Sequence, residues 1–366
     1  MTVHLLAGGG TAGHVNPLLA VADRLRERNP DDTVLVLGTA EGLESRLVPA
    51  RGYELLTIAK VPFPRRPNRA ALAFPARFRA SIDDVRTIIE ERGVDVVVGF
   101  GGYVSTPAYL AARKLGIPVV IHEANAKPGL ANRLGARWAS AVGVAFRGTP
   151  LPGAVPVGMP LRKEIESLDR RAERTEAARY FDLDADRPVL LATGGSLGAR
   201  RINATMVASA EVLTGTGWQV LHITGAKSEV SDPGLAGYRM VEYADRMDLA
   251  LAIADLAVSR AGAATVSELA ALGIPAVYIP YPVGNGEQRF NAAEVVEAGG
   301  GILVDDAAFL PGWVDARLVP LLADRGRVDA MAHAAASAGH RDGTDRMIAL
   351  IDGALGGGAR DAAHNA

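Results

Sequence analysis

Two glycine-rich turns set the strongest limit on how this chain of 366 residues can fold. The turn at residues 9–13 directly follows the apolar run 5–7, and the turn at residues 194–198 follows the apolar run 190–192. A buried strand that leads through a glycine turn into a helix is typical of a Rossmann-like domain. A second phrase, Leu-Gly-Ile-Pro, begins at Leu115 and again at Leu272. Because both phrases occur in the same order in each half, the sequence predicts two Rossmann-like domains.

Short runs rich in valine, leucine and isoleucine recur along the chain and predict buried strands. The predicted strands are residues 3–7, 33–37, 94–99, 119–122, 189–193, 219–224 and 276–280. Helical patterns lie between them. In the first of these, Leu18, Val21, Ala22 and Leu25 share one face, and Pro17 suits a first turn. Alternating strands and helices favour parallel sheets that are covered on both faces.

A cluster of prolines marks the expected join between the two domains. Four prolines and two glycines fall within residues 150–161. The predicted organisation is an N-terminal Rossmann-like domain at residues 1–158 and a C-terminal Rossmann-like domain at residues 159–340. We expect a helix at residues 341–355 and a disordered, glycine- and alanine-rich tail at residues 356–366.

Composition narrows the function mainly by exclusion. Hydrophobic residues make up 49% of the chain and charged residues 22%, which is ordinary for a globular protein. The net charge of −2 gives no global field that would favour nucleic acid as a partner. There is no cysteine, which excludes disulfides, thiolate metal sites and a cysteine nucleophile. No secretory signal is apparent, and the uncharged run 96–112 contains too many glycine, serine and proline residues to suggest a membrane-spanning helix.

The first glycine turn matches the dinucleotide fingerprint at Gly8, Gly10 and Gly13. Backbone N–H groups at a helix N-terminus attract phosphate. A nicotinamide site also needs an acidic residue at the end of the second strand, and Glu41 lies off that place. His14, directly after the third glycine, is unusual for a cofactor loop. The glycine pattern leaves a nicotinamide-dependent oxidoreductase open as one interpretation of the chain, although Glu41 and His14 do not favour it. A non-catalytic nucleotide-sugar-binding protein is a second interpretation that stays open.

Further loops are expected at the carboxyl ends of the predicted strands, at the same edge of each sheet as the glycine turns. Residues 99–103 and 122–125 end strands of the first half, and residues 259–268 run from small residues into a helix start. A helix start favours phosphate, and Glu268 one turn later can accept hydrogen bonds from two ribose hydroxyls. The alternative is an N-capped helix with an acidic first turn. Residues 284–292 supply amide groups suited to sugar hydroxyls.

Taken together, these motifs resemble the MurG family over nearly the whole chain. The matching segments, in order, are the loop from Gly13 to Pro17, the loop at residues 101–105, the His-Glu-x-Asn motif at residues 122–125, the third glycine loop at residues 194–199, the donor motif at residues 263–268 and the Gln-x-x-Asn-Ala motif at residues 288–292. Each motif alone is modest evidence, whereas the complete ordered set is highly specific.

The resemblance implies an α/β protein with the GT-B fold, in which two Rossmann-like domains face a cleft and the last helix returns to the first domain. It implies an inverting N-acetylglucosaminyltransferase that takes the sugar from UDP-N-acetylglucosamine. The N-terminal domain would lie on the acceptor and membrane side, and the C-terminal domain would bind UDP-N-acetylglucosamine. The acceptor would be the C4 hydroxyl of N-acetylmuramic acid in undecaprenyl-pyrophosphoryl-MurNAc-pentapeptide (lipid I), and the product would be lipid II of peptidoglycan synthesis. By the same resemblance, contacts to UDP-N-acetylglucosamine would fall on Thr11, Ala12, Gly13, Asn125, Arg162, Ser196, Ala263, Ala264, Thr265, Val266, Ser267, Glu268 and Gln288.

Two positions depart from relatives in this family. Leu197 replaces a glutamine seen in some relatives, which weakens the case for a side-chain contact there. Ala244 stands where relatives can carry a larger apolar residue against uracil, so the base would lean on Met247 or on the backbone.

The acceptor hydroxyl needs a base, and His14 is the first candidate because imidazole can be neutral near pH 7. Glu123 is the second candidate. A role for His14 as a hydrogen-bond donor to phosphate remains open at this point.

No metal or other cofactor is expected. The aspartates at positions 182, 184 and 186 match the Asp-x-Asp pattern of metal-dependent sugar transferases, but they precede a strand and are assigned to a surface turn. His4 and His222 lie in strand patterns and are assigned structural roles, and the seven histidines show no metal-ligand spacing.

A local patch must hold such an enzyme at the cytoplasmic face of the cell membrane, where it would be peripheral. Residues 62–79 are the candidate because arginines alternate with apolar residues and no acidic residue interrupts them. The patch residues are Arg65, Arg66, Arg69, Leu72, Phe74, Arg77, Phe78 and Arg79. A solvated arginine-rich loop is the alternative. Proteins of cell-wall synthesis or cell division are further candidate partners.

Overall fold

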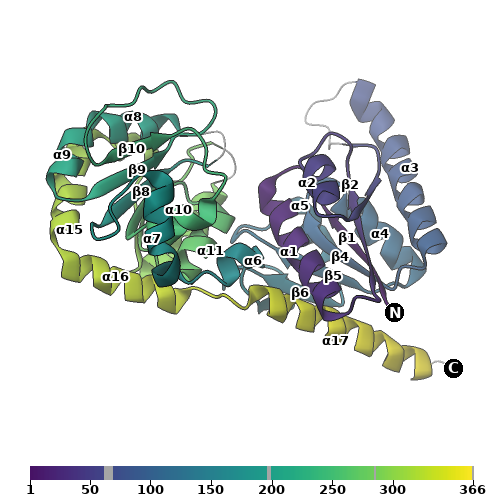
Figure 1. Ribbon diagram of the computed structural model, residues 1–366. Helices are drawn as coiled ribbons and strands as arrows, with labels where there is room; N and C mark the ends of the chain where they lie inside the picture. The colour runs from purple at the N-terminus through teal and green to yellow at the C-terminus, as the bar shows by residue number, and fades with distance from the viewer. Residues whose placement is uncertain (62–68, 196–198, 284–285, 365–366) are drawn as a thin grey trace. The chain divides into compact units, whose positions relative to one another are not determined.

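The first unit of the chain, Met1–Arg162 together with Arg341–Ala366, is built on a parallel sheet of seven strands (Figure 1). The structure, a computed structural model, describes residues 1–61, 69–195, 199–283 and 286–364. The strand order is β3-β2-β1-β4-β5-β6-β7. The strands are β1 (Val3–Gly8), β2 (Thr33–Gly38), β3 (Glu54–Thr57), β4 (Val96–Gly101), β5 (Val119–Glu123), β6 (Ala141–Val144) and β7 (Ala154–Pro156).

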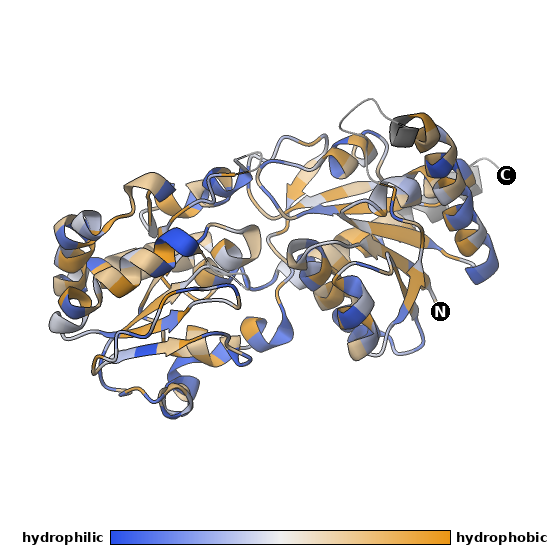
Figure 2. Ribbon diagram, turned by 90° about the horizontal axis from the view of Figure 1, so that it is seen from above, coloured by the Kyte–Doolittle hydropathy of each residue, from blue (hydrophilic) through white to orange (hydrophobic). Residues whose placement is uncertain are grey.

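Alternate residues of these strands face opposite sides of the sheet, as the period of two requires. Leu5 belongs to a core formed with α3 (Arg69–Arg92) and α4 (Ser105–Leu115). Leu6 belongs to a core formed with α1 (Ala12–Arg28) on the other face. Figure 2 shows the strands largely in the colour of hydrophobic residues. The short helices α2 (Glu44–Ala50) and α5 (Leu130–Gly135) complete this unit's connections.

The last helix, α17 (Gly343–His364), belongs to this first unit. Its residues Met347, Ile348 and Ile351 are buried in the same core as Leu6, and it lies beside α1 (Figure 1). Ion pairs from Arg24 to Asp345 and from Arg28 to Asp352 join the two helices at the surface.

Two predicted boundaries differ from the structure. The first unit continues to Arg162 rather than ending at residue 158, since Met159 lies so close to Gly343 that any side chain there would collide with it. Residues 356–364, which we predicted to be disordered, continue α17 as a helix.

The second unit, Lys163–His340, repeats the doubly wound plan with six parallel strands. The strand order is β10-β9-β8-β11-β12-β13, which is the Rossmann order counted from β8. The strands are β8 (Val189–Thr193), β9 (Gln219–Ile223), β10 (Tyr238–Val241), β11 (Leu256–Ser259), β12 (Ala276–Tyr278) and β13 (Gly301–Leu303). Two Rossmann-like domains were predicted from the repeated glycine turns, and the structure confirms them.

Helices cover both faces of the second sheet. One core lies between the sheet and α8 (Arg200–Ala208), α9 (Ala210–Gly215), α15 (Val319–Ala323) and α16 (Arg325–Ala338). The remaining elements are α6 (Lys163–Glu166), α7 (Arg170–Phe181), α10 (Met247–Ile253), α11 (Ala263–Ala271), α12 (Glu287–Asn291), α13 (Ala293–Glu297), η1 (Asp306–Ala308), α14 (Pro311–Trp313) and η2 (Val314–Leu318).

None of the helices in the described part of the chain is long and apolar enough to cross a membrane.

Candidate functional site

The first glycine loop places His14 in the first turn of α1, at the carboxyl edge of the first sheet. The imidazole Nδ1 lies 3.0 Å from the carbonyl oxygen of Gly9 and 3.2 Å from the hydroxyl of Thr11. A carbonyl oxygen can only accept a hydrogen bond, so this contact requires a proton on Nδ1. In the neutral ring, the other nitrogen, Nε2, then keeps its lone pair.

The second glycine loop packs directly onto the first. Gly101 and Gly102 have φ angles of 97° and 89°, in the left-handed region that favours glycine. A Cβ on Gly102 would come within 2.7 Å of the Gly9 carbonyl oxygen, and a Cβ on Gly101 within 3.1 Å of His14 Nε2. Ser105 accepts a hydrogen bond from Gly101 N–H at 3.1 Å and thereby fixes the turn. Both glycines therefore allow the loop to approach His14.

Glu44 lies beneath the first loop and was not recognised from the sequence. Its carboxylate is buried, and it accepts hydrogen bonds from Gly10 N–H at 2.8 Å and from the N–H and hydroxyl of Thr39 at 2.9 and 2.8 Å. Gly10 N–H is thus already paired inside the protein. A phosphate in a dinucleotide site would need such N–H groups, so this contact argues against the nicotinamide alternative.

A pocket of about 220 Å³ opens beside this loop, on the side of β2. It is lined by Gly9, Gly10, Thr39, Glu41, Gly42, Leu43, Glu44, Lys60, Tyr103 and Val104. The ammonium group of Lys60 lies 5.6 Å from the centre of the Tyr103 ring, where a cation–π interaction is favourable.

Glu123, the second candidate base, is held on all sides by donors. Its carboxylate accepts hydrogen bonds from Asn125 N–H, Gly129 N–H and the Asn132 amide, each at 2.9 Å. It is also buried. These contacts occupy the carboxylate oxygens and close the loop after β5, so they favour a positioning role over proton abstraction.

The second unit carries the donor motif at the carboxyl edge of its own sheet. Its helix α11 begins at Ala263 after Gly262, which supplies no side-chain cap. The N–H groups of Ala263, Ala264 and Thr265 lie in this first turn, where the helix dipole favours an anion. Val266 has no exposed surface, so only its backbone is available to a ligand. Ser267 and Glu268 are half-buried.

Two residues that the sequence analysis placed in motifs, but to which it gave no role, hold the donor motif. The guanidinium of Arg260 donates to the carbonyl oxygens of Ile279 and Pro280 and to Asp306, the last at 2.6 Å. The buried amide of Asn291 donates to the carbonyl oxygen of Ala261 at 3.3 Å. The motif is thus tied to the segments that follow β12 and β13.

Gln288 is oriented by its own loop. Its carbonyl oxygen Oε1 accepts a hydrogen bond from Tyr281 N–H at 2.9 Å. The amide nitrogen Nε2 therefore points its two donors elsewhere, and it is suited to hydroxyl or carbonyl oxygens of a sugar.

The structure describes most, but not all, of the other residues that were predicted to contact the donor. Ser196 and Leu197 lie outside the described residues. Arg162 is the last residue of the first unit before α6. Ala244 is buried, and Met247 begins α10 at half-buried exposure. Thr11, Ala12 and Gly13 lie in the first loop, and Asn125 follows β5.

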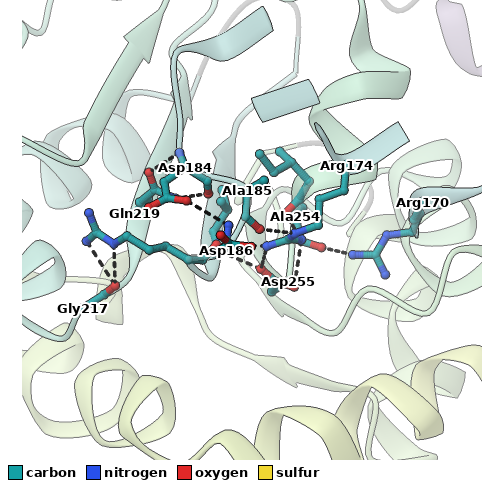
Figure 3. A network of polar contacts seen from close by, with 12 residues as sticks. Arg170, Arg174, Asp184, Ala185, Asp186, Gly217, Gln219, Ala254 and Asp255 are labelled. Atoms are coloured by element: carbon teal, nitrogen blue, oxygen red, sulfur yellow. Dashed lines mark hydrogen bonds and ion pairs between the residues drawn. The ribbon is translucent and has the colours of Figure 1, made fainter. Parts of the chain in front are cut away.

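The Asp-x-Asp segment precedes β8 and therefore lies at the amino edge of the second sheet, as predicted. Figure 3 shows the polar contacts around Asp184 and Asp186. The Asp184 backbone exchanges two hydrogen bonds with the Gln219 amide, each at 2.8 Å, and its carboxylate accepts from Asp186 N–H. Arg174 bridges nearby to Asp255 at 3.0 Å. These contacts give the aspartates a role in the turn. Among the described residues, no group of three or more acidic or histidine side chains is arranged to hold a metal ion.

Three histidines of the described strands, His4, His122 and His222, are buried in the protein interior. Burial lowers the pKa of His122 and of His222 to about 4, so both rings are neutral near pH 7. His222 is hydrogen-bonded to Tyr238 and Asn203, at 2.8 and 3.1 Å.

Comparisons with known proteins match both units. Residues 4–144 match the glycosyltransferase family 28 N-terminal domain, and residues 189–347 match the glycosyltransferase family 28 C-terminal domain. The UDP-N-acetylglucosamine–N-acetylmuramyl-(pentapeptide) pyrophosphoryl-undecaprenol N-acetylglucosamine transferase of Leifsonia xyli subsp. xyli is 68% identical over 96% of this chain and 98% of its own. The enzyme of the same name from Clavibacter sepedonicus is 65% identical over 97% of both chains. The crystal structure of Acinetobacter baumannii MurG is 28% identical, with a TM-score of 0.77 over 96% of this chain and all of its own.

Two Rossmann-like domains that match both halves of glycosyltransferase family 28 define a glycosyltransferase of the GT-B fold. The chain belongs to the MurG family, the UDP-N-acetylglucosamine–N-acetylmuramyl-(pentapeptide) pyrophosphoryl-undecaprenol N-acetylglucosamine transferases. The fold class, the family and the class of enzyme predicted from the sequence are confirmed.

Proposed function

We propose that this N-acetylglucosaminyltransferase works by a single displacement in which the first unit activates the acceptor and the second unit holds the donor. The C4 hydroxyl oxygen of N-acetylmuramic acid attacks the anomeric carbon of the donor sugar. The bond between that carbon and the β-phosphate breaks, and the configuration inverts. The hydroxyl proton passes to a base, and UDP leaves with the electron pair.

His14 is the proposed base. The contact of its Nδ1 with the Gly9 carbonyl oxygen is the observation that supports this role, because it leaves Nε2 as a proton acceptor. The hydrogen bonds that hold Glu123 argue against that carboxylate as the base.

The donor is proposed to lie at the start of α11. The uncapped N–H groups of Ala263, Ala264 and Thr265 would stabilise the charge that develops on the diphosphate. Glu268 would accept hydrogen bonds from the ribose hydroxyls, and Gln288 Nε2 would contact the N-acetylglucosamine. Arg162, Asn125, Ser196 and the loop from Thr11 to Gly13 remain proposed donor contacts.

Turnover is the direct test of this function. With UDP-N-acetylglucosamine and an acceptor that carries a lipid-linked pyrophosphoryl-MurNAc-pentapeptide, we expect release of one UDP for each sugar transferred. A chain that binds UDP in calorimetry but yields no product with this acceptor would be a binding protein. Binding of NAD in place of UDP would contradict the assignment altogether.

The acceptor of such a reaction is anchored in the membrane by its lipid, so we propose that the protein docks on the cytoplasmic face through α3. Leu72 is 84% exposed, and Arg77 and Arg79 are exposed one and two turns later. Phe74 stacks on Phe78 at 5.3 Å between ring centres. Arg65 and Arg66 lie outside the described residues, as does the side chain of Arg69. Phe78 also packs against the core, so Leu72 and Phe74 are the better candidates for lipid contact.

Replacing Arg77 and Arg79 with glutamine is expected to weaken binding to anionic vesicles about 30-fold. Each arginine near an anionic surface contributes roughly 1 kcal/mol, and about 1.4 kcal/mol corresponds to a factor of ten. Sedimentation with phosphatidylglycerol vesicles measures this, and transfer to a short-chain soluble acceptor should be unchanged. The matched control replaces Arg317 and Arg327 of the second unit, which are also exposed. Equal loss in both variants would place the membrane contact elsewhere.

A further inference from the structure

A buried carboxylate lies one peptide group behind His14. Glu44 Oε2 accepts a hydrogen bond from Gly10 N–H at 2.8 Å. The carbonyl oxygen of the same peptide group belongs to Gly9, and it lies 3.0 Å from His14 Nδ1. Carboxylate, peptide and imidazole therefore form one continuous chain of hydrogen bonds.

The direction of this chain follows from what each atom can do. The carboxylate and the carbonyl oxygen are acceptors, so the peptide N–H and His14 Nδ1–H must be the donors. In the other tautomer of His14, two lone pairs would face each other at 3.0 Å. The Thr11 hydroxyl, 3.2 Å from Nδ1, can serve as a second acceptor without changing this result.

The surroundings of Glu44 favour the charged form of its carboxylate. Burial by itself would raise the pKa of its carboxyl, but hydrogen bonds from Gly10, from its own backbone and from Thr39 hold that pKa below the usual value. Glycines surround the side chain, and a Cβ at Gly9, Gly38 or Gly42 would collide with it. The space around the carboxylate is therefore shaped for this one residue.

We propose that Glu44 is a positioning residue for sugar transfer, which holds His14 in the Nδ1–H tautomer through the Gly9–Gly10 peptide group. A carboxylate on the N–H end of a peptide polarises its carbonyl oxygen into a stronger acceptor, because successive hydrogen bonds reinforce one another. The arrangement is related to the direct aspartate–histidine pair of serine hydrolases, with a peptide group inserted between the two side chains. The proposal rests on the base role of His14.

The test replaces Glu44 with glutamine, which has nearly the same shape. A glutamine can accept from Gly10 N–H or from Thr39 N–H through its one oxygen, but its NH₂ group would then oppose the other donor. We expect kcat to fall at least tenfold while KM for UDP-N-acetylglucosamine stays within twofold. Nitrogen-15 NMR of labelled histidine should show protonated Nδ1 in the neutral wild-type ring and a mixture of tautomers in the variant.

Two matched variants separate this effect from general damage. Glu41→Gln changes an exposed carboxylate that lines the same pocket, and it should leave both readouts unchanged. Thr39→Val removes one hydrogen bond to Glu44 but keeps its charge, so the Nδ1–H tautomer should persist. Near-ultraviolet circular dichroism confirms that the first unit remains folded.

Several results would overturn the proposal. A neutral wild-type His14 with its proton on Nε2 would do so without any variant, even if Glu44→Gln does not fold. Unchanged kcat and tautomer in Glu44→Gln would also do so. If His14→Ala retained turnover, the base role would fail, whereas the tautomer measurement would still report on the hydrogen-bond chain.

Discussion

Replacing His14 with alanine is expected to lower kcat by two to four orders of magnitude, the usual contribution of a general base. KM for UDP-N-acetylglucosamine should change less than threefold, because the variant keeps the backbone of the first loop. Steady-state kinetics with a soluble acceptor measure both quantities. Added imidazole should restore part of the lost turnover, since a small base can occupy the vacated space.

The control for this experiment is His333→Ala, which removes an exposed histidine from α16 of the second unit. It should leave kcat unchanged. If His14→Ala instead raised KM for the acceptor, kept kcat near normal and showed no rescue by imidazole, His14 would be a hydrogen-bond donor to phosphate.

The second large effect is expected at Glu268. Its replacement by alanine should weaken UDP and UDP-N-acetylglucosamine alike, by about 3 kcal/mol or roughly a hundredfold, because hydrogen bonds to a charged group contribute about 1.5–3 kcal/mol each. Isothermal titration calorimetry with both ligands measures this. Glu297→Ala, an exposed carboxylate in α13 of the same unit, is the control.

Gln288 offers a sharper comparison within the same site. Gln288→Ala removes the two Nε2 donors and adds no charge to the site. It should weaken UDP-N-acetylglucosamine and leave UDP unchanged. If Glu268→Ala and Gln288→Ala weakened UDP equally, the proposed division between ribose and sugar contacts would be wrong.

The sequence predicted the architecture well because the glycine turns and apolar strands are local signals. It missed most strands of only three or four residues, such as β3 and β13, since so few residues show no clear period. It also missed β11, because that strand follows the apolar helix α10 after only two residues, Ala254 and Asp255. No local pattern separates the end of one from the start of the other.

The sequence predicted those residues of the candidate site that directly follow a strand in the chain. His14 and the donor motif each follow a strand directly, which places them at a ligand edge. Glu44 could not be found this way, because its partner Gly10 is 34 residues distant and only the folded sheet brings them together. The glycines at positions 38 and 42 were the one available signal, and they become meaningful only once Glu44 is seen between them.

The place of α17 has a consequence for how the protein is made. Met347, Ile348 and Ile351 cover one face of the sheet of the first unit, yet they are synthesised only after the whole second unit. Until α17 has been made, the apolar face beside α1 lacks this cover, and the nascent first unit is open to association with other chains. A truncation that removes α17 would therefore first affect the domain that carries His14, although the two are far apart in the sequence.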